Sequence, residues 1–246
     1  IVIFNDRTPE TQYAAYLAGK NDISLDYVED GLAAYIPPIE KAPNFFHGIL
    51  AKFLFGRYYY NIITLGTSPY TTTVRVFFPD MVISALRQKE IRPLSVELFD
   101  RIDRKMIEEL TEDIKDDIEY LLVLPHSEIL GGNTQLGAVS LKDRMQEVAV
   151  QAAERYGRIG VKYHPREKGE YLGLYTGCDT LPRHTPMELI YLKLKGKELK
   201  EVAGPLSTSI YTARIILGDD VTITTVGNVD GPDALRFLKH LRKDAL

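Results

Sequence analysis

The chain has 246 residues, a length that suits one large domain or two Rossmann-sized halves. A formal net charge of −4 argues against a nucleic-acid-binding protein, and a single cysteine excludes an internal disulfide framework and a thiol-rich zinc site. No apolar run is long enough for a membrane span, and no signal-peptide pattern is present, so we expect a cytoplasmic protein. The first residue is not methionine, from which we expect a trimmed or processed chain.

The first part of the chain alternates strand and helix. Residues 1–4 have the apolar pattern of a buried strand, and Thr8 and Pro9 predict the start of a helix. Residues 23–28 alternate polar and apolar side chains, as a further strand does. This strand ends at Glu29-Asp30-Gly31, which places acidic groups at the carboxyl end of a strand.

The middle of the chain is rich in aromatic residues and proline, with helical spacing over 44–55 and a strand pattern over 74–78. Residues 95–110 predict a charged helix capped by Ser95. Residues 111–119 are strongly acidic and are expected to be an exposed linker. We therefore predict two domains, residues 1–115 and 116–246.

The second half also alternates strand and helix, which predicts an α/β fold with parallel sheets. The continuous apolar run at 120–125 is typical of a parallel strand that is covered on both faces. Strands are expected near 159–162, 199–202 and 221–226, and helices over 141–156, 186–193, 210–217 and 232–243.

Two features of the second half predict a phosphate site. Pro165 disfavours helical backbone at His164, so the strand ends with the imidazole at its carboxyl end, where ligands bind in open α/β sheets. The hydroxyl cluster Ser207-Thr208-Ser209 begins a helix, and free backbone N–H groups at a helix start bind anions. A phosphate between the two features indicates a nucleotide ligand.

The acidic motif, the His-Pro pair and the serine cluster occur in this order along the chain. In this the chain resembles the bacterial sialyltransferases of the GT-B fold, above all the polysialyltransferase and lipooligosaccharide sialyltransferase branches. The resemblance implies two Rossmann-like domains with an active site in the cleft between them. It assigns the acceptor to the first domain and the CMP-sugar to the second. Only 28 residues precede Glu29, fewer than in the family, so the first domain is expected to be truncated.

The resemblance also implies roles for individual residues. Glu29 is the expected general base, and His164 is expected to contact the nucleotide phosphate and to act as general acid. The expected nucleotide-binding residues are Lys162, Pro165, Glu188, Ser207, Thr208 and Ser209. Secondary candidates are Asp30, Gly31 and Asn133.

The implied reaction is an inverting transfer of sialic acid from CMP-sialic acid to a glycan hydroxyl, such as a galactoside or sialoside of a surface polysaccharide or lipooligosaccharide. The donor already carries a good leaving group, so neither a metal nor another cofactor is expected. Two alternatives stay open: transfer from another CMP-ulosonate such as CMP-Kdo, and a non-catalytic nucleotide- or glycan-binding relative. The acceptor, the linkage and the oligomeric state are not defined by the sequence.

Each candidate also has a structural interpretation. Glu29 and Asp30 suit a helix start, Ser207 to Ser209 suit an ordinary N-cap, and Glu188 suits a first helical turn. His164 alone is more typical of a hydrogen-bonded histidine at a strand end than of a catalytic group. The other histidines lack metal-like spacing and are taken as structural; they are His47, His126, His184 and His240.

The basic helix over 232–243 has two interpretations. Its apolar stripe either packs on the last domain, which we favour, or rests peripherally on the inner face of an anionic membrane.

Overall fold

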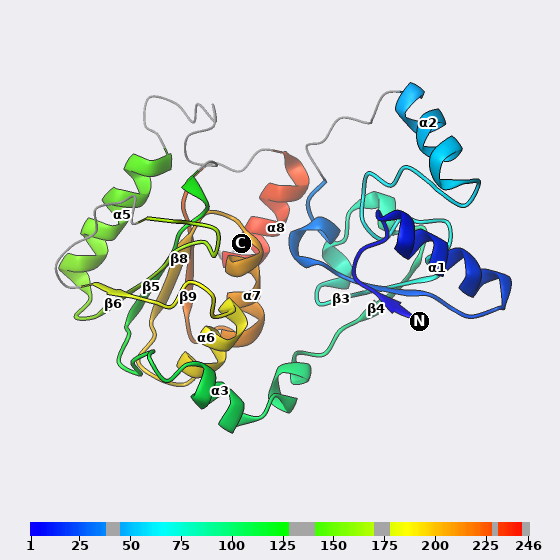
Figure 1. Ribbon diagram of the computed structural model, residues 1–246. Coiled ribbons are helices and arrows are strands. Elements are labelled where there is room, and N and C mark those ends of the chain that lie inside the picture. Colours follow the sequence, from blue (N-terminus) through cyan, green and yellow to red (C-terminus); the bar gives the residue numbers. More distant parts are fainter. Residues whose placement is uncertain (38–44, 128–140, 170–177, 228–230, 243–246) are drawn as a thin grey trace. The chain divides into compact units, whose positions relative to one another are not determined.

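A computed structural model describes residues 1–37, 45–127, 141–169, 178–227 and 231–242 (Figure 1). The chain divides into two compact units. Unit 1 comprises Ile1–Ser95 and Gly231–Phe237, and unit 2 comprises Val96–Asp230 and Leu238–Leu246. Each unit contains one sheet whose neighbouring strands pair in parallel. The chain is therefore α/β, with two sheets of parallel strands.

Unit 1 has a four-stranded sheet in the order β1-β2-β3-β4. Its strands and helices are β1 (Val2–Ile3), α1 (Pro9–Lys20), β2 (Asp26–Val28), α2 (Phe45–Phe55), β3 (Thr73–Val76) and β4 (Glu90–Pro93). Short 3₁₀-helices are η1 (Gly31–Ala34), η2 (Pro79–Met81) and η3 (Ser84–Leu86). The predicted start of α1 is confirmed, because the Thr8 side chain accepts the Thr11 N–H and Pro9 is the first helical residue.

The two edge strands of unit 1 differ from the sequence prediction. β1 was expected to be buried, but it lies at the edge of the sheet and the Val2 side chain is 57% exposed. β4 was not expected, because Glu90 and Arg92 give it no apolar pattern and Pro93 weakens a strand prediction. An edge strand has only one neighbour and needs neither an apolar pattern nor a full set of N–H donors.

Unit 2 has a five-stranded sheet in the order β7-β6-β5-β8-β9. Its strands are β5 (Tyr120–Val123), β6 (Ile159–Lys162), β7 (Cys178–Thr180), β8 (Glu201–Gly204) and β9 (Thr222–Thr225). Its helices are η4 (Val96–Arg101), α3 (Arg104–Leu110), α5 (Leu141–Arg155), α6 (Met187–Leu194) and α7 (Thr208–Leu217). The last helix, α8 (Pro232–Arg242), contributes residues to both units.

The central strand β5 is buried on both faces, as its continuous apolar run predicted. Leu121 and Val123 belong to the hydrophobic cluster that contains α6 and α7, and Tyr120 and Leu122 belong to the cluster that contains α5. Figure 1 shows α5 on one side of this sheet and α6 and α7 on the other. At Gly204 a Cβ would lie 2.6 Å from the Val123 carbonyl oxygen, so β8 approaches β5 here only because the residue is glycine.

The segment between the two sheets is organised differently from the prediction. Instead of one helix capped by Ser95, the segment forms η4 followed by α3. The N-cap of α3 is Asp103, whose carboxylate accepts the Lys105 N–H at 2.9 Å. The acidic residues 111–119 are no linker, because Ile114 and Ile118 are buried in the unit 2 core. The division between the units falls at Ser95, before the expected boundary after residue 115.

The apolar stripe of α8 is packed rather than exposed. Phe237, Leu238 and Leu241 are buried, the Tyr35 ring stacks on Phe237 at 4.6 Å, and the Arg214 Nε donates to the Leu241 carbonyl at 2.7 Å. Leu238 and Leu241 belong to unit 2, the last domain of the favoured interpretation, whereas Phe237 belongs to unit 1 and stacks on Tyr35 there. Among the described residues, no helix combines the length and the hydropathy that a bilayer span requires.

Candidate nucleotide site and a buried carboxylate

A cavity of about 320 Å³ lies at the carboxyl ends of the unit 2 strands. Its walls come from the ends of β5 and β6, the loop before α6 and the start of α7. In the strand order, β6 and β7 lie on one side of β5 and β8 and β9 on the other. The cavity therefore lies where the strand order reverses, which is where open α/β sheets bind ligands. Its volume is at the lower end of the range for small-molecule sites.

Five of the residues predicted from the sequence line this cavity, and they come from three separate segments. They are Lys162, His164, Pro165, Glu188 and Ser209. The remaining lining residues are Val123, Leu124, Tyr163, His184, Thr185, Pro186 and Met187. The fold thus brings together residues that are distant in the sequence.

Lys162 fixes the loop that closes one side of the cavity. Its Nζ donates to the Pro182 carbonyl at 2.8 Å and to the Arg183 carbonyl, and the residue is only 2% exposed. Burial, followed by the nearby Arg183, lowers the pKa of Lys162 to about 8. The ammonium group is still mostly charged at pH 7, so it supplies a positive charge at the strand end.

The His164 ring is held in a defined orientation. Its Nδ1 accepts the Arg166 backbone N–H at 3.2 Å, so the neutral imidazole carries its proton on Nε2. Burial lowers the pKa of His164, and so do the nearby His126 and Arg166. These surroundings therefore keep His164 mainly neutral at pH 7, with an N–H donor at Nε2.

Two histidines for which the sequence predicts only a structural role lie at this site. The His126 ring meets the His164 ring edge-on, with centroids 5.4 Å apart, and His184 lines the cavity. A sequence signal for His126 existed: like His164 it follows a buried parallel strand, and neighbouring strands end at the same edge of a sheet. For His184 the only indication in the sequence is its position just before the helix that carries Glu188.

The serine cluster divides between two roles. Ser207 is the N-cap of α7, and its Oγ accepts the Ile210 N–H at 3.4 Å, as the structural interpretation predicted. Thr208 is exposed and is absent from the cavity wall, which Ser209 alone of the three lines. The Tyr191 hydroxyl donates to the Ser209 carbonyl at 2.9 Å and so links α6 to the start of α7.

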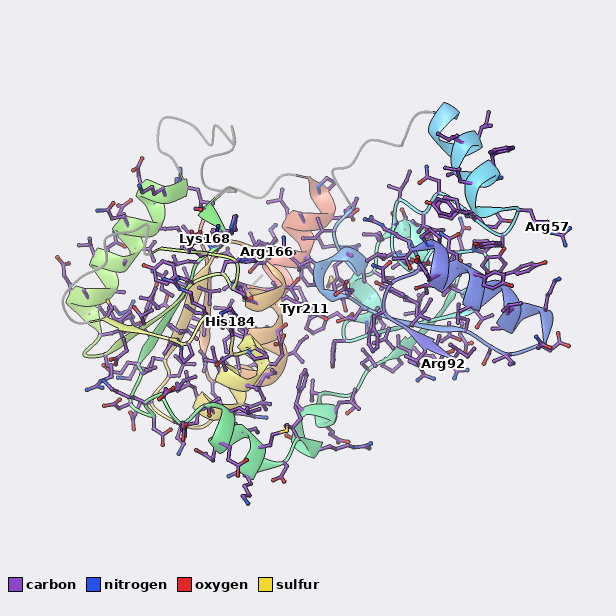
Figure 2. The ribbon with its side chains drawn as sticks, in the orientation of Figure 1. Arg57, Arg92, Arg166, Lys168, His184 and Tyr211 are labelled. Carbon is purple, nitrogen blue, oxygen red and sulfur yellow. The ribbon has the colours of Figure 1, made fainter. Side chains whose placement is uncertain are left out.

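Cationic side chains gather around the loop that follows β6. Figure 2 shows Arg166 and Lys168 on this loop and His184 on the loop before α6. Arg183 donates to the Glu167 carbonyl at 3.0 Å, while the Glu167 carboxylate accepts the Ser127 N–H at 2.9 Å. Among the described residues of this loop, Arg166 and Lys168 outnumber the single carboxylate of Glu167, and this positive balance favours an anionic ligand.

Unit 1 holds the other predicted catalytic residue, Glu29, at the end of β2. The side chain is 8% exposed, and its Oε2 accepts the Phe77 N–H at 3.1 Å and the Tyr35 hydroxyl. The Tyr35 oxygen in turn accepts the Phe78 N–H at 3.1 Å. Because β2 and β3 are parallel neighbours, the residues that leave β3 meet the carboxylate that follows β2.

Burial raises the pKa of Glu29 to about 8, although the bonds from Tyr35 and Phe77 act in the opposite direction. A carboxyl group that titrates near neutral pH is suited to general base catalysis. Asp30 precedes η1 without a side-chain capping bond, so the capping interpretation is not realised by its carboxylate. Gly31 has a φ of 62°, a backbone conformation that favours glycine.

Asn133, a secondary candidate, lies outside the described residues. Within the described ranges, no group of three or more His, Cys, Asp or Glu side chains is arranged to share a metal ion. A scan against protein-family models gives no match to this chain, and a search of curated proteins gives none either.

Proposed function

We propose that the protein is an inverting sialyltransferase that takes CMP-sialic acid as its donor and binds the CMP moiety in the unit 2 cavity. The GT-B fold is part of this proposal. The observation that supports it most is the cavity itself. Residues expected to bind a cytidine nucleotide converge at the switch point of a parallel sheet, although they come from three separate segments.

In this scheme the CMP phosphate lies against His164 and the start of α7. The Nε2 proton of His164, the Ser209 hydroxyl and the Lys162 charge stabilise the negative charge that grows as the phosphate leaves. Glu188, in the first turn of α6, accepts hydrogen bonds from the ribose hydroxyls. The proposal is supported by the cavity that these residues share, because electrostatic stabilisation requires groups that are in position before the reaction.

Glu29 acts on the acceptor. Its carboxylate removes the proton of the acceptor hydroxyl while that oxygen forms a bond to C2 of sialic acid and the bond from C2 to the phosphate oxygen breaks. The products are the sialylated acceptor and CMP, with inversion at C2 and the acceptor proton on Glu29. The raised pKa of Glu29 makes its carboxylate a stronger base than an exposed one.

A second candidate is a nucleotide-binding protein without transferase activity. It is favoured by the engagement of Glu29, whose carboxylate is buried and bonded to Tyr35 and Phe77. In this reading Glu29 serves only the fold of unit 1, and the cavity binds CMP without turnover.

CMP release from CMP-sialic acid and from CMP-Kdo, with and without galactoside and sialoside acceptors, separates the candidates. We expect acceptor-dependent release from CMP-sialic acid in the presence of EDTA, and a loss of about 10²- to 10⁴-fold in the Glu29→Gln variant. Glu10→Gln, an exposed glutamate of the same unit, is the matched control and is expected to keep full activity. Tight CMP binding without release from either donor would favour the binding protein. Release from CMP-Kdo alone would identify CMP-Kdo, rather than CMP-sialic acid, as the donor.

A further inference from the structure

Helix α2 of unit 1 exposes an apolar face that the proposed transferase chemistry does not use. Ile49, Leu50, Phe53 and Leu54 are 52%, 54%, 85% and 64% exposed, respectively. Residues four apart lie one above the other on a helix, so these four side chains share one face. Ala51, on the remaining surface, is buried. Figure 1 shows α2 at the periphery of unit 1.

The charged side chains of the segment that carries this face are all cationic. The chain as a whole has more Asp and Glu than Lys and Arg, yet no carboxylate occurs between Glu40 and Asp80. The cations on and just after α2, Lys52 and Arg57, are exposed, and Figure 2 shows Arg57 at the outer end of this region. An apolar face whose own segment, residues 41–79, carries cations and no carboxylate is complementary to an anionic lipid surface.

Tyrosine rings surround the same cations. The Tyr13 and Tyr58 rings lie 4.9 Å apart, Arg57 donates to the Tyr16 hydroxyl at 3.3 Å, and the Lys52 Nζ lies 5.5 Å from the centre of the Tyr60 ring. Tyr13 and Tyr60 are themselves exposed. Tyrosine is enriched where protein meets the headgroup layer of a membrane, because its ring is apolar and its hydroxyl is polar.

We propose that α2 is a membrane-contact helix that lies in the plane of an anionic lipid surface, with Ile49, Leu50, Phe53 and Leu54 inserted and with Lys52 and Arg57 at the headgroups. Eleven residues extend about 16 Å, half of the hydrocarbon thickness, so the helix lies along the surface rather than across it. A second copy of the chain fits less well. A twofold contact through this face would bring two cationic segments together, neither of which supplies a carboxylate.

The chain contains no tryptophan, which makes a single substitution a clean reporter. The Phe53→Trp variant is mixed with vesicles of phosphatidylcholine alone or with added phosphatidylglycerol, and its emission is recorded. We expect a blue shift with the anionic vesicles that high salt reverses. The Leu235→Trp variant is the matched control, because Leu235 is 47% exposed on α8, and its emission is expected to stay unchanged.

Co-sedimentation with the same vesicles tests the apolar face directly. The double variant Phe53→Ser/Leu54→Ser is expected to bind anionic vesicles at least about tenfold more weakly than the wild type, with an unchanged circular dichroism spectrum. Equal vesicle binding by the wild type and this variant would overturn the proposal, and so would the absence of binding to either vesicle. Self-association that the double variant abolishes, without lipid binding, would assign the face to a second copy instead. None of these readouts depends on CMP or on turnover.

Discussion

Glu29 is mainly uncharged in the free protein at neutral pH, because its pKa of about 8 lies well above the ordinary value near 4.5. The folded state therefore binds a proton that the unfolded state releases between these two values. This contribution to stability is fully present below pH 4.5 and is lost as the pH rises through about 8. The residue proposed as a base is thus one whose charge destabilises the fold.

Replacing Glu29 by glutamine is expected to stabilise the protein, increasingly so as the pH rises from about 5 to 8. Glutamine carries no charge, and its carbonyl oxygen can accept the same bonds from Tyr35 and Phe77. The gain at pH 8 is about 3 to 5 kcal/mol in the free energy of unfolding, from the shift in pKa. Urea unfolding of wild type and variant across this pH range measures it. A difference that does not change with pH would contradict the assignment of the raised pKa to Glu29.

At the scale of single elements, the serine cluster offers a test that separates capping from ligand binding. Ser207→Ala removes the cap of α7 and is expected to destabilise the protein by about 1 kcal/mol while leaving CMP affinity unchanged. Ser209→Ala is expected to leave stability nearly unchanged and to weaken CMP binding about fivefold, because Ser209 lines the cavity. Thermal unfolding and calorimetry on both variants decide this. A loss of affinity in the Ser207 variant alone would reverse the two roles.

The elements that the sequence predicted well are those in which local pattern and tertiary environment agree. The apolar run of β5 is covered on both faces, and α7 begins with its capping serine. The strand β7 (Cys178–Thr180) was missed, because three residues at a sheet edge carry no periodicity. The acidic segment 111–119 was predicted to be a linker because of its many carboxylates. Its two isoleucines, Ile114 and Ile118, instead anchor it in the hydrophobic core.

At the scale of the whole molecule, the sequence predicts a set of nucleotide-binding residues, and the fold brings only some of them to the cavity. The cavity contains His164 and Glu188, whose positions follow from strand ends and helix starts that local patterns define. Sequence alone did not assign His126 and His184, because their proximity to His164 depends on which strands are neighbours. Likewise, the sequence alone did not show that Ser209 lines the cavity while Ser207 caps α7, because this depends on how α6 packs against α7.

The most direct test of the cavity as a CMP site is calorimetric titration of CMP into the wild type, the His164→Asn variant and the His240→Asn variant, an exposed control on α8. We expect the His164 variant to bind about tenfold more weakly at pH 7, because a hydrogen bond to the charged phosphate is lost, and the control to bind normally. A bound phosphate favours protonated His164, so the wild-type advantage is expected to grow as the pH falls toward the lowered pKa of His164. Equal affinity of all three proteins, or no CMP binding by the wild type, would contradict the account.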